Sequence, residues 1–266
     1  MSDAHSAEVP SGDVAPGEVV LSMRGLRKRF GGKEVLRGLD LDVRRGEILT
    51  LLGASGSGKS VLLKVIVGPV RADAGEVIFH GGHLEGLDDH ALAPVRRRIG
   101  MVFQSAALFD SLSVADNVAY GLRAEGPGGL APDAIRTRVA WALECVGLRD
   151  ADVLMPSELS GGMRKRIGVA RTIALRPEVV LYDEPTTGLD PRNSARIGAL
   201  IASLREQLAV TSVIVTHDLA LARSVSDRLA FLHEGRIVAV GSVADVSATT
   251  DPIVRAFLDG TAGGAD

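Results

Sequence analysis

One stretch constrains the fold of this chain more than any other: GASGSGKS, which runs from Gly53 to Ser60. It matches the pattern G-x-x-x-x-G-K-[ST], in which backbone N–H groups and a lysine surround phosphate oxygens. The nearly continuous apolar run at 47–53 predicts a strand buried on both faces, and a helix is predicted over 59–67. This strand–loop–helix context favours a phosphate-binding loop over a glycine-rich connection that binds nothing.

The residues of this loop suit the phosphate chain of a nucleotide. The glycines at Gly53, Gly56 and Gly58 let successive backbone N–H groups turn inward. Lys59 would supply positive charge to the β- and γ-phosphates, and Ser60 would offer a hydroxyl to Mg²⁺. The predicted phosphate-contacting residues are Gly53, Ala54, Ser55, Gly56, Ser57, Gly58, Lys59 and Ser60.

Two carboxylates follow another predicted strand, at the end of VVLYDE. Asp183 at the strand tip would hold the water shell of Mg²⁺, and Glu184 would orient or deprotonate an attacking water. Two acids at a strand end can also be ordinary surface residues. Their position downstream of a phosphate loop favours the catalytic interpretation.

Single polar residues follow two more predicted strands. Gln104 comes directly after IGMVF, and His217 comes directly after the apolar strand at 211–216. Taken alone, each of them could equally be a structural or solvent-exposed residue. Because parallel strands deliver their carboxyl ends to one edge of a sheet, all four strand ends together predict a single site.

A second turn suited to an anion lies far downstream, in LSGGMRKR at 159–166. Ser160, Gly161 and Gly162 open a predicted helix, whose first N–H groups attract negative charge. The three basic residues that follow are expected to form a solvated helix face: Arg164, Lys165 and Arg166.

The order of the predicted elements indicates an α/β fold. Antiparallel strands with one solvated face are expected at 18–30 and 34–43. Helical periodicity dominates 105–156, which predicts a helical insertion. Strands and helices then alternate from 179 to 240, as in a mainly parallel sheet covered by helices.

Composition restricts the class of protein. The 266 residues are 46% hydrophobic and 24% charged, which excludes disorder of the whole chain, and the net charge of −3 argues against a general nucleic-acid binder. No secretion signal is visible, and no apolar run approaches the ~20 residues of a membrane span. The chain is therefore expected to be cytosolic, or to be held at a membrane by partner proteins. Residues 1–17 are expected to form a disordered leader.

From Val19 to about Gly241 the chain resembles an ATP-binding-cassette (ABC) ATPase. The motifs that match, in the family's order, are Lys59 in Walker A, Gln104 in the Q-loop, Leu159 to Met163 in the signature turn, Asp183 and Glu184 in Walker B, Gly188 to Asp190 in the D-loop, and His217 as the switch histidine. The resemblance implies a P-loop NTPase (RecA-like) core with an antiparallel β subdomain and an inserted helical subdomain at about 105–157. The ABC domain would span 18–258, followed by a disordered tail at 259–266.

The resemblance also implies the ligands and the role of each site residue. ATP and Mg²⁺ would bind, with Phe30 stacked on the adenine. The catalytic residues would be Glu184, His217 and Gln104, and the metal-holding residues would be Ser60, Gln104 and Asp183. Similar ATPases form head-to-tail dimers, in which Ser160, Gly161 and Gly162 of one subunit grip the γ-phosphate bound to the other. The two anion-holding turns would then serve one ligand from opposite sides.

Three segments resemble those of one subgroup, the ATPases of Mla/MCE-type phospholipid-trafficking transporters: 103–114, 154–163 and 257–260. The usual signature turn ends in glutamine, whereas this one ends in Met163, whose side chain cannot make the hydrogen bonds of an amide. This resemblance implies phospholipid transport that contributes to lipid asymmetry. The implied partners are a membrane permease and an MCE-type lipid-binding protein, at the cytoplasmic face of the inner membrane.

Other functions stay open at this point. The chain could serve a transporter of another small-molecule cargo, a DNA-maintenance or translation ATPase, or a nucleotide-binding regulator without turnover. A long coiled coil and a tandem cassette are both absent from the sequence, which disfavours a DNA-maintenance or translation ATPase. The presence of Glu184 and His217 disfavours a regulator without turnover. The apolar cluster Ala106 to Phe109 is either core or a groove for a short permease helix.

Overall fold

The computed structural model describes residues 17–123 and 130–261. The chain divides into two compact units, which are described separately: unit 1 comprises 1–96 with 211–266, and unit 2 comprises 97–210. The predicted leader, except for Gly17, lies outside the described residues, and so do residues 262–266 of the predicted tail.

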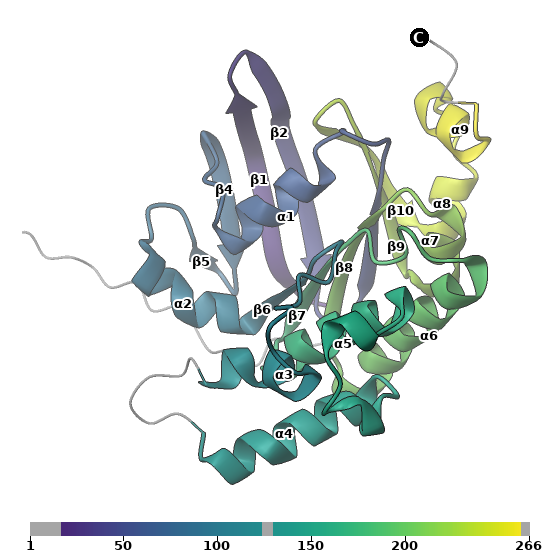
Figure 1. The fold of residues 1–266 in the computed structure, drawn as a ribbon. Helices are drawn as coiled ribbons and strands as arrows, with labels where there is room; N and C mark the ends of the chain where they lie inside the picture. The colour runs from purple at the N-terminus through teal and green to yellow at the C-terminus, as the bar shows by residue number, and fades with distance from the viewer. Residues whose placement is uncertain (1–16, 124–129, 262–266) are drawn as a thin grey trace, which may run out of the picture. The chain divides into compact units, whose positions relative to one another are not determined.

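Unit 1 contains the predicted antiparallel sheet, drawn in purple to blue in Figure 1. Its strands, in the order in which they pair, are β2 (Lys33–Arg44), β1 (Val19–Phe30), β4 (Ala74–Phe79) and β5 (Gly82–His83). In β2, Leu39, Leu41 and Val43 are buried while Asp40 and Asp42 reach solvent, but in β1 the run from Val20 to Met23 is buried throughout. The period of two in β2 confirms the prediction of a strand with one wet face, whereas the first part of β1 is buried on both faces.

Unit 1 also contains the strand that leads into the phosphate loop. This strand, β3 (Ile48–Leu52), pairs in parallel with β8 (Thr211–Thr216) on one side and with β9 (Arg228–His233) on the other. An edge strand, β10 (Arg236–Ser242), runs antiparallel to β9. Every residue of β3 and β8 is buried, as the continuous apolar runs predict for strands covered on both faces.

The helices of unit 1 include three that the sequence patterns did not predict. Those predicted were α1 (Lys59–Val67) and α7 (Leu219–Val225), and those missed were α2 (Asp89–Arg98), α8 (Val243–Ser247) and α9 (Pro252–Leu258). The helix α2 has Pro94 in its interior, and a proline at such a position argues against a helix when the sequence pattern alone is considered. Residues 259–261 of the predicted tail are described, and the N–H groups of Asp259 and Thr261 donate to carbonyls of α9.

Unit 2 combines two parallel strands with a group of helices, coloured teal to green in Figure 1. Its strands are β6 (Ile99–Val102) and β7 (Val179–Asp183), and its α-helices are α3 (Val114–Arg123), α4 (Pro132–Cys145), α5 (Gly161–Ile173) and α6 (Pro191–Leu208). The helices α3, α4 and α5 all contact one another. The described part of 105–157 contains helices, turns and irregular segments but no strand. Within the two described ranges, no helix has both the length and the apolar character to cross a bilayer.

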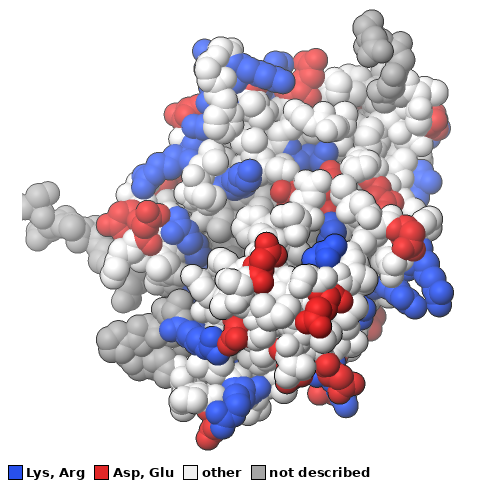
Figure 2. All heavy atoms as spheres, viewed as in Figure 1, with Lys and Arg blue, Asp and Glu red and all other residues white. Residues whose placement is uncertain are grey.

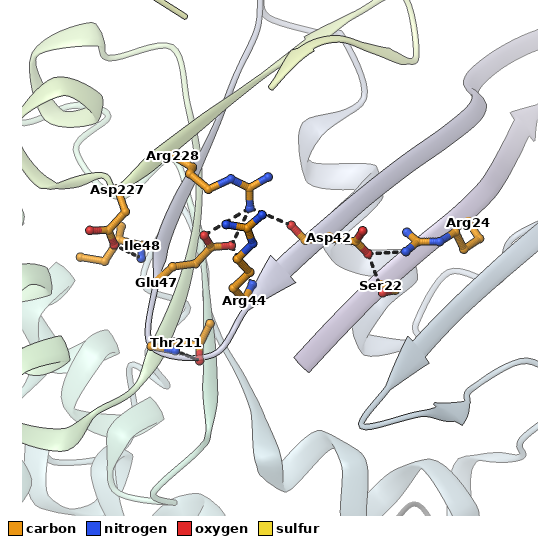
Figure 3. A network of polar contacts seen from close by, with 10 residues as sticks. Ser22, Arg24, Asp42, Arg44, Glu47, Ile48, Thr211, Asp227 and Arg228 are labelled. Carbon is orange, nitrogen blue, oxygen red and sulfur yellow. Dashed lines mark hydrogen bonds and ion pairs between the residues drawn. The ribbon is translucent and has the colours of Figure 1, made fainter. Parts of the chain in front are cut away.

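A polar network in unit 1 sets where β3 begins (Figure 3). The carboxylate of Glu47, only 7% exposed, accepts from Arg228 Nη1 at 3.0 and 3.2 Å and from the Arg44 N–H at 2.7 Å. One residue further on, the Ile48 N–H donates to Asp227 at 2.8 Å. These contacts join the first residues of β3 to the start of β9. Because β3 is short, its starting point also determines where the chain enters the phosphate loop.

We expect Glu47→Ala to lower the free energy of unfolding by about 3 kcal/mol, because it leaves the Arg228 guanidinium half-buried without its partner. Chemical denaturation monitored by circular dichroism would measure the loss. The matched control is Asp133→Ala, which removes an exposed ion pair with Arg136 and should cost less than about 1 kcal/mol. Equal losses in the two variants would show that the network does not stabilise unit 1.

Candidate functional site

The predicted phosphate loop follows β3 in unit 1, and its carbonyl groups accept hydrogen bonds from the loop's own lysine. Lys59 is 5% exposed, and its Nζ donates to the carbonyls of Gly53 at 2.8 Å and Ala54 at 3.0 Å. The Ser57 N–H donates to the Ala54 carbonyl at 3.2 Å, which makes the turn compact. The lysine ammonium therefore lies inside the loop, at the first turn of α1.

Two glycines of this loop have no room for a side chain. A Cβ on Gly53 would lie 2.5 Å from the Leu232 carbonyl oxygen. Gly58 has a φ of 108°, and a Cβ there would lie 3.0 Å from the Val35 carbonyl oxygen. Glycine is required at both positions. Because glycine has no side chain, the backbone of the loop can turn tightly and its N–H groups can approach a ligand closely.

The loop also contains a buried polar atom that fits a phosphate ligand. Among the described residues, no hydrogen-bond partner is found for Ser57 Oγ, although the atom is buried. Such an atom costs free energy unless a ligand or water satisfies it. The rim of the loop, at Ala54 to Gly56, is exposed to solvent. Together with the α1 N-terminus and Lys59, these groups could hold an anionic phosphate chain.

His217 lies beside this loop, as the prediction of a shared sheet edge requires. Leu52 at the end of β3 is paired with Thr216 at the end of β8, so the loop and His217 leave adjacent parallel strands at the same level. The His217 side chain is exposed. The next residue, Asp218, caps α7 by accepting from the Leu221 N–H at 3.0 Å, which holds the turn after β8.

Phe30 lies at the end of β1 with 47% of its surface exposed. Lys28 Nζ is 5.3 Å from the centroid of the Phe30 ring, and the same ammonium pairs with Asp73 at 2.7 Å. An exposed ring beside a cation is suited to stacking on a planar base. Its role in adenine binding stays a prediction.

Unit 2 brings together the predicted glutamine and both predicted carboxylates. Val102 at the end of β6 is paired with Tyr182 near the end of β7, so Gln104 and Asp183 leave the same edge of these two parallel strands. Gln104 is exposed, whereas Asp183 and Glu184 are 6% and 9% exposed. These three residues follow the ends of two paired parallel strands, and their roles stay predictions.

Glu184 has an unusual backbone conformation for its residue type. Its φ is 46°, in the left-handed region that non-glycine residues adopt at a cost of about 1 kcal/mol or more. The Thr187 hydroxyl donates to Glu184 Oε2 at 3.3 Å, and the Thr187 N–H donates to the Glu184 carbonyl at the same distance. The surrounding turn therefore imposes this conformation on Glu184, as is common for residues at functional sites.

Lys165 contradicts the prediction of a solvated basic face on α5. It is 8% exposed, and its Nζ donates to the Glu184 carbonyl at 3.3 Å. Burial lowers the pKa of the Lys165 ammonium, and the carboxylates of Glu184 and Asp183 oppose that shift. The prediction was wrong for Lys165 because the helix turns this residue toward β7. Of the three basic residues, Arg164 is exposed, Arg166 is partly buried and Lys165 is buried.

The predicted signature turn forms the N-terminus of α5. Ser160 caps the helix by accepting from the Met163 N–H at 3.3 Å, and both Ser160 and Gly161 are exposed. A Cβ on Gly162 would lie 3.4 Å from Asn193 Oδ1, at the start of α6. The signature turn and the N-terminus of α6 are thus neighbours within unit 2.

The segment after Gln104 is held by an arginine that the sequence did not reveal as important. Ala106 and Ala107 have φ values of 63° and 48°. Arg171 on α5 donates to their carbonyls at 3.0 and 2.7 Å, and its guanidinium lies 6.0 Å from the Phe109 ring centroid. The local sequence carries no signal for this contact, because Arg171 is 64 or more positions away.

This turn divides the predicted apolar cluster into two kinds of residue. Ala106 is 2% exposed and packs against Gly168, where a Cβ would lie 3.2 Å from the Ala106 Cβ. Phe109 is 41% exposed and lies against Tyr120, with ring centroids 4.5 Å apart. Ala106 therefore belongs to the core and Phe109 to the surface, while the permease groove stays a prediction.

A family profile described as "ABC transporter" matches residues 36–187, more than half of the chain. The chain belongs to the ABC transporter family. Among its relatives is the "Intermembrane phospholipid transport system ATP-binding protein MlaF" of Escherichia coli (strain K12), 42% identical over 92% of this chain and 90% of the relative. The MlaF protein of Haemophilus influenzae is 39% identical over 92% of each chain.

A second kind of relative within the ABC transporter family is similar to the same degree. The "Methionine import ATP-binding protein MetN" of Rhizobium johnstonii is 41% identical over 92% of this chain and 67% of that protein. Identity alone therefore does not distinguish the two kinds of cargo.

Solved ABC cassettes confirm the predicted P-loop fold. The structure of cbiO1 from Clostridium perfringens, described as part of the ABC transporter complex cbiONQ, gives a TM-score of 0.80 at 30% identity and covers 91% of this chain and 95% of that one. The ATP-binding cassette MJ0796, in a dimeric post-hydrolysis state bound to ADP and Pi, gives a TM-score of 0.77 at 30% identity and covers 84% and 98%. Phosphate loop, strand-end residues and signature turn thus lie in a fold shared with ABC ATPases.

Proposed function

We propose that this chain is the ATP-binding and ATP-hydrolysing subunit of an ABC transporter and that it powers a membrane permease. The observation that carries the proposal is the loop after β3, which combines an inward-held Lys59, two glycines without room for a Cβ and a buried serine hydroxyl without a described partner. Membership of the ABC transporter family and structural likeness to a cassette bound to ADP and Pi support it.

In this proposal the reaction is the Mg²⁺-dependent hydrolysis of ATP to ADP and phosphate. Lys59 and the loop N–H groups would bind the β- and γ-phosphates, and Ser60, Asp183 and Gln104 are the residues that would hold the metal ion. When bound, Mg²⁺ neutralises charge on the phosphate oxygens. Glu184 orients the attacking water and accepts its proton, in a position that the left-handed turn and Thr187 define. His217 contacts the γ-phosphate region from the end of β8.

The proposal includes a second copy of the subunit. The exposed Ser160 and Gly161, with Gly162, would grip the γ-phosphate bound to the other subunit, so that ATP closes a head-to-tail dimer. Support comes from the α5 N-terminus, which presents N–H groups to solvent, and from the dimeric state of the similar cassette MJ0796.

We further propose that the cargo is phospholipid and that the site of action is the cytoplasmic face of the inner membrane, with a permease and an MCE-type lipid-binding protein as partners. The MlaF relatives support this cargo. A second candidate, import of a small molecule such as an amino acid, is supported by the MetN relatives. On the face shown in Figure 2, acidic and basic side chains of the described residues are interspersed.

The permease would dock on the segment that follows Gln104. Phe109 is exposed beside Tyr120, and Arg171 fixes the backbone that carries it. Apolar anchors of this kind dominate the free energy of protein interfaces. A docked helix at this place would respond to any movement of Gln104, which lies in the same turn-rich segment.

We expect Phe109→Asp to reduce recovery of the permease about tenfold or more, because it puts a charge into an apolar contact. The measurement is affinity purification from detergent-solubilised membranes, with mass spectrometry of the copurified proteins and lipids. The matched control is Val153→Asp, at a 76% exposed apolar residue outside this segment, which should retain the permease.

The same experiment distinguishes the two cargo candidates. Recovery of an MCE-type protein and phospholipid supports the first, and recovery of an amino-acid permease without them supports the second. Normal permease recovery with Phe109→Asp would contradict the proposal that the permease docks at Phe109. Loss of the folded state in that variant, seen by circular dichroism, would show that Phe109 stabilises unit 2 instead.

A further inference from the structure

We propose that Lys165 is a positioning residue for hydrolysis, whose ammonium holds the Glu184 peptide group in the conformation that directs the carboxylate. The inference rests on the proposed function of Glu184 as the residue that activates water. It concerns contacts within unit 2 alone.

The first step of the argument is the contact itself. Lys165 Nζ donates to the Glu184 carbonyl at 3.3 Å, and the Thr187 N–H donates to the same oxygen. Both donors therefore act on the peptide group that follows Glu184. A peptide group is planar, so its orientation is coupled to the ψ angle of Glu184 and to the direction of the chain beyond it.

The second step is the strain at Glu184. A φ of 46° is unfavourable for a residue with a Cβ, and it persists only where the surroundings enforce it. Thr187 lies within the same turn, whereas Lys165 is 19 positions away on α5. Lys165 is thus a long-range restraint that ties this turn to a rigid helix.

The third step is the cost of placing a lysine here. Burying an ammonium is expensive unless nearby negative groups compensate, and Lys165 is 8% exposed. Asp183 and Glu184 supply that negative charge. An apolar side chain would fill the same space without the desolvation cost, so the ammonium has a use that packing alone does not explain.

We expect Lys165→Met, which keeps the length of the side chain but removes the donor, to lower kcat for ATP hydrolysis about tenfold while changing KM less than about threefold. Lys165→Arg should restore a substantial part of kcat, because it returns a cationic donor. The matched control is Lys64→Met, which removes an exposed lysine from α1 and should leave both constants unchanged. Unchanged kcat in folded Lys165→Met, or no recovery in folded Lys165→Arg, would overturn the proposal.

A double variant tests whether Lys165 acts through Glu184. In a Glu184→Gln background, Lys165→Met should reduce the residual turnover less than about twofold, because residues that act as a unit give non-additive effects. A full further tenfold fall would show that Lys165 acts on something other than Glu184 and would overturn the inference. Absence of ATPase activity in the unmodified protein would instead contradict the proposed function, so the two failures can be distinguished.

Discussion

Replacing Glu184 with glutamine should remove most ATP turnover, about 100-fold or more, while nucleotide affinity stays close to that of the unmodified protein. Glutamine has nearly the same shape and keeps an oxygen that can accept from Thr187, so the left-handed turn should persist. It lacks the negative charge needed to orient and deprotonate water. Steady-state phosphate release and binding of a fluorescent ATP analogue would measure the two quantities separately.

The comparison for this result is Lys59→Ala in the phosphate loop. Since the Lys59 ammonium lies inside the loop, its removal should weaken ATP binding about tenfold or more as well as slow turnover. The two variants therefore separate binding from chemistry. Near-normal turnover in both would contradict the assignment of the site.

ATP should convert the Glu184→Gln protein from monomer to dimer, and a bulky residue at Gly161 should abolish that conversion. Gly161 is exposed at the N-terminus of α5, and a Cβ there would meet nothing closer than a Leu189 methyl carbon at 3.8 Å. Gly161→Trp should therefore fold. Its ring would occupy the space in which the signature turn approaches the phosphates of the other subunit.

Light scattering with and without ATP would measure the effect, with Gly161→Trp made in the Glu184→Gln background. ATP binding to the phosphate loop should remain within about threefold of the parent, because that loop belongs to the subunit's own nucleotide site. The matched control is Ala134→Trp on the exposed first turn of α4, which should still dimerise. An ATP-induced dimer in Gly161→Trp would show that the signature turn lies outside the interface.

Several elements could be predicted because their signals are local. The run from Ile48 to Leu52 is continuously apolar, and a strand covered on both faces has that pattern. The helix Lys59–Val67 and the strand Thr211–Thr216 have the predicted bounds. The strand-end positions of Gln104, Glu184 and His217 followed from one topological rule about parallel strands.

Other features could not be predicted from local sequence patterns, for identifiable reasons. The helix α2 was missed because it carries Pro94, which is unfavourable inside a helix, and the burial of Leu92 and Val95 offsets that cost. Burial of Lys165 was missed, although a signal existed. Lys165, Val169 and Thr172 recur at helical spacing, so the lysine shares the buried face of α5.

The amino-acid sequence by itself predicts which residues of this protein would bind phosphate, because the glycines and lysine of the loop act through their own backbone and charge within eight positions. It also determines the alternation of strands and helices, which depends on periodicity along the chain. The tertiary structure alone decides that Arg171 holds the backbone before Phe109 and that Lys165 reaches the Glu184 carbonyl. Those contacts join positions 64 and 19 residues apart. They depend on the three-dimensional path of the backbone and on which face of α5 is buried.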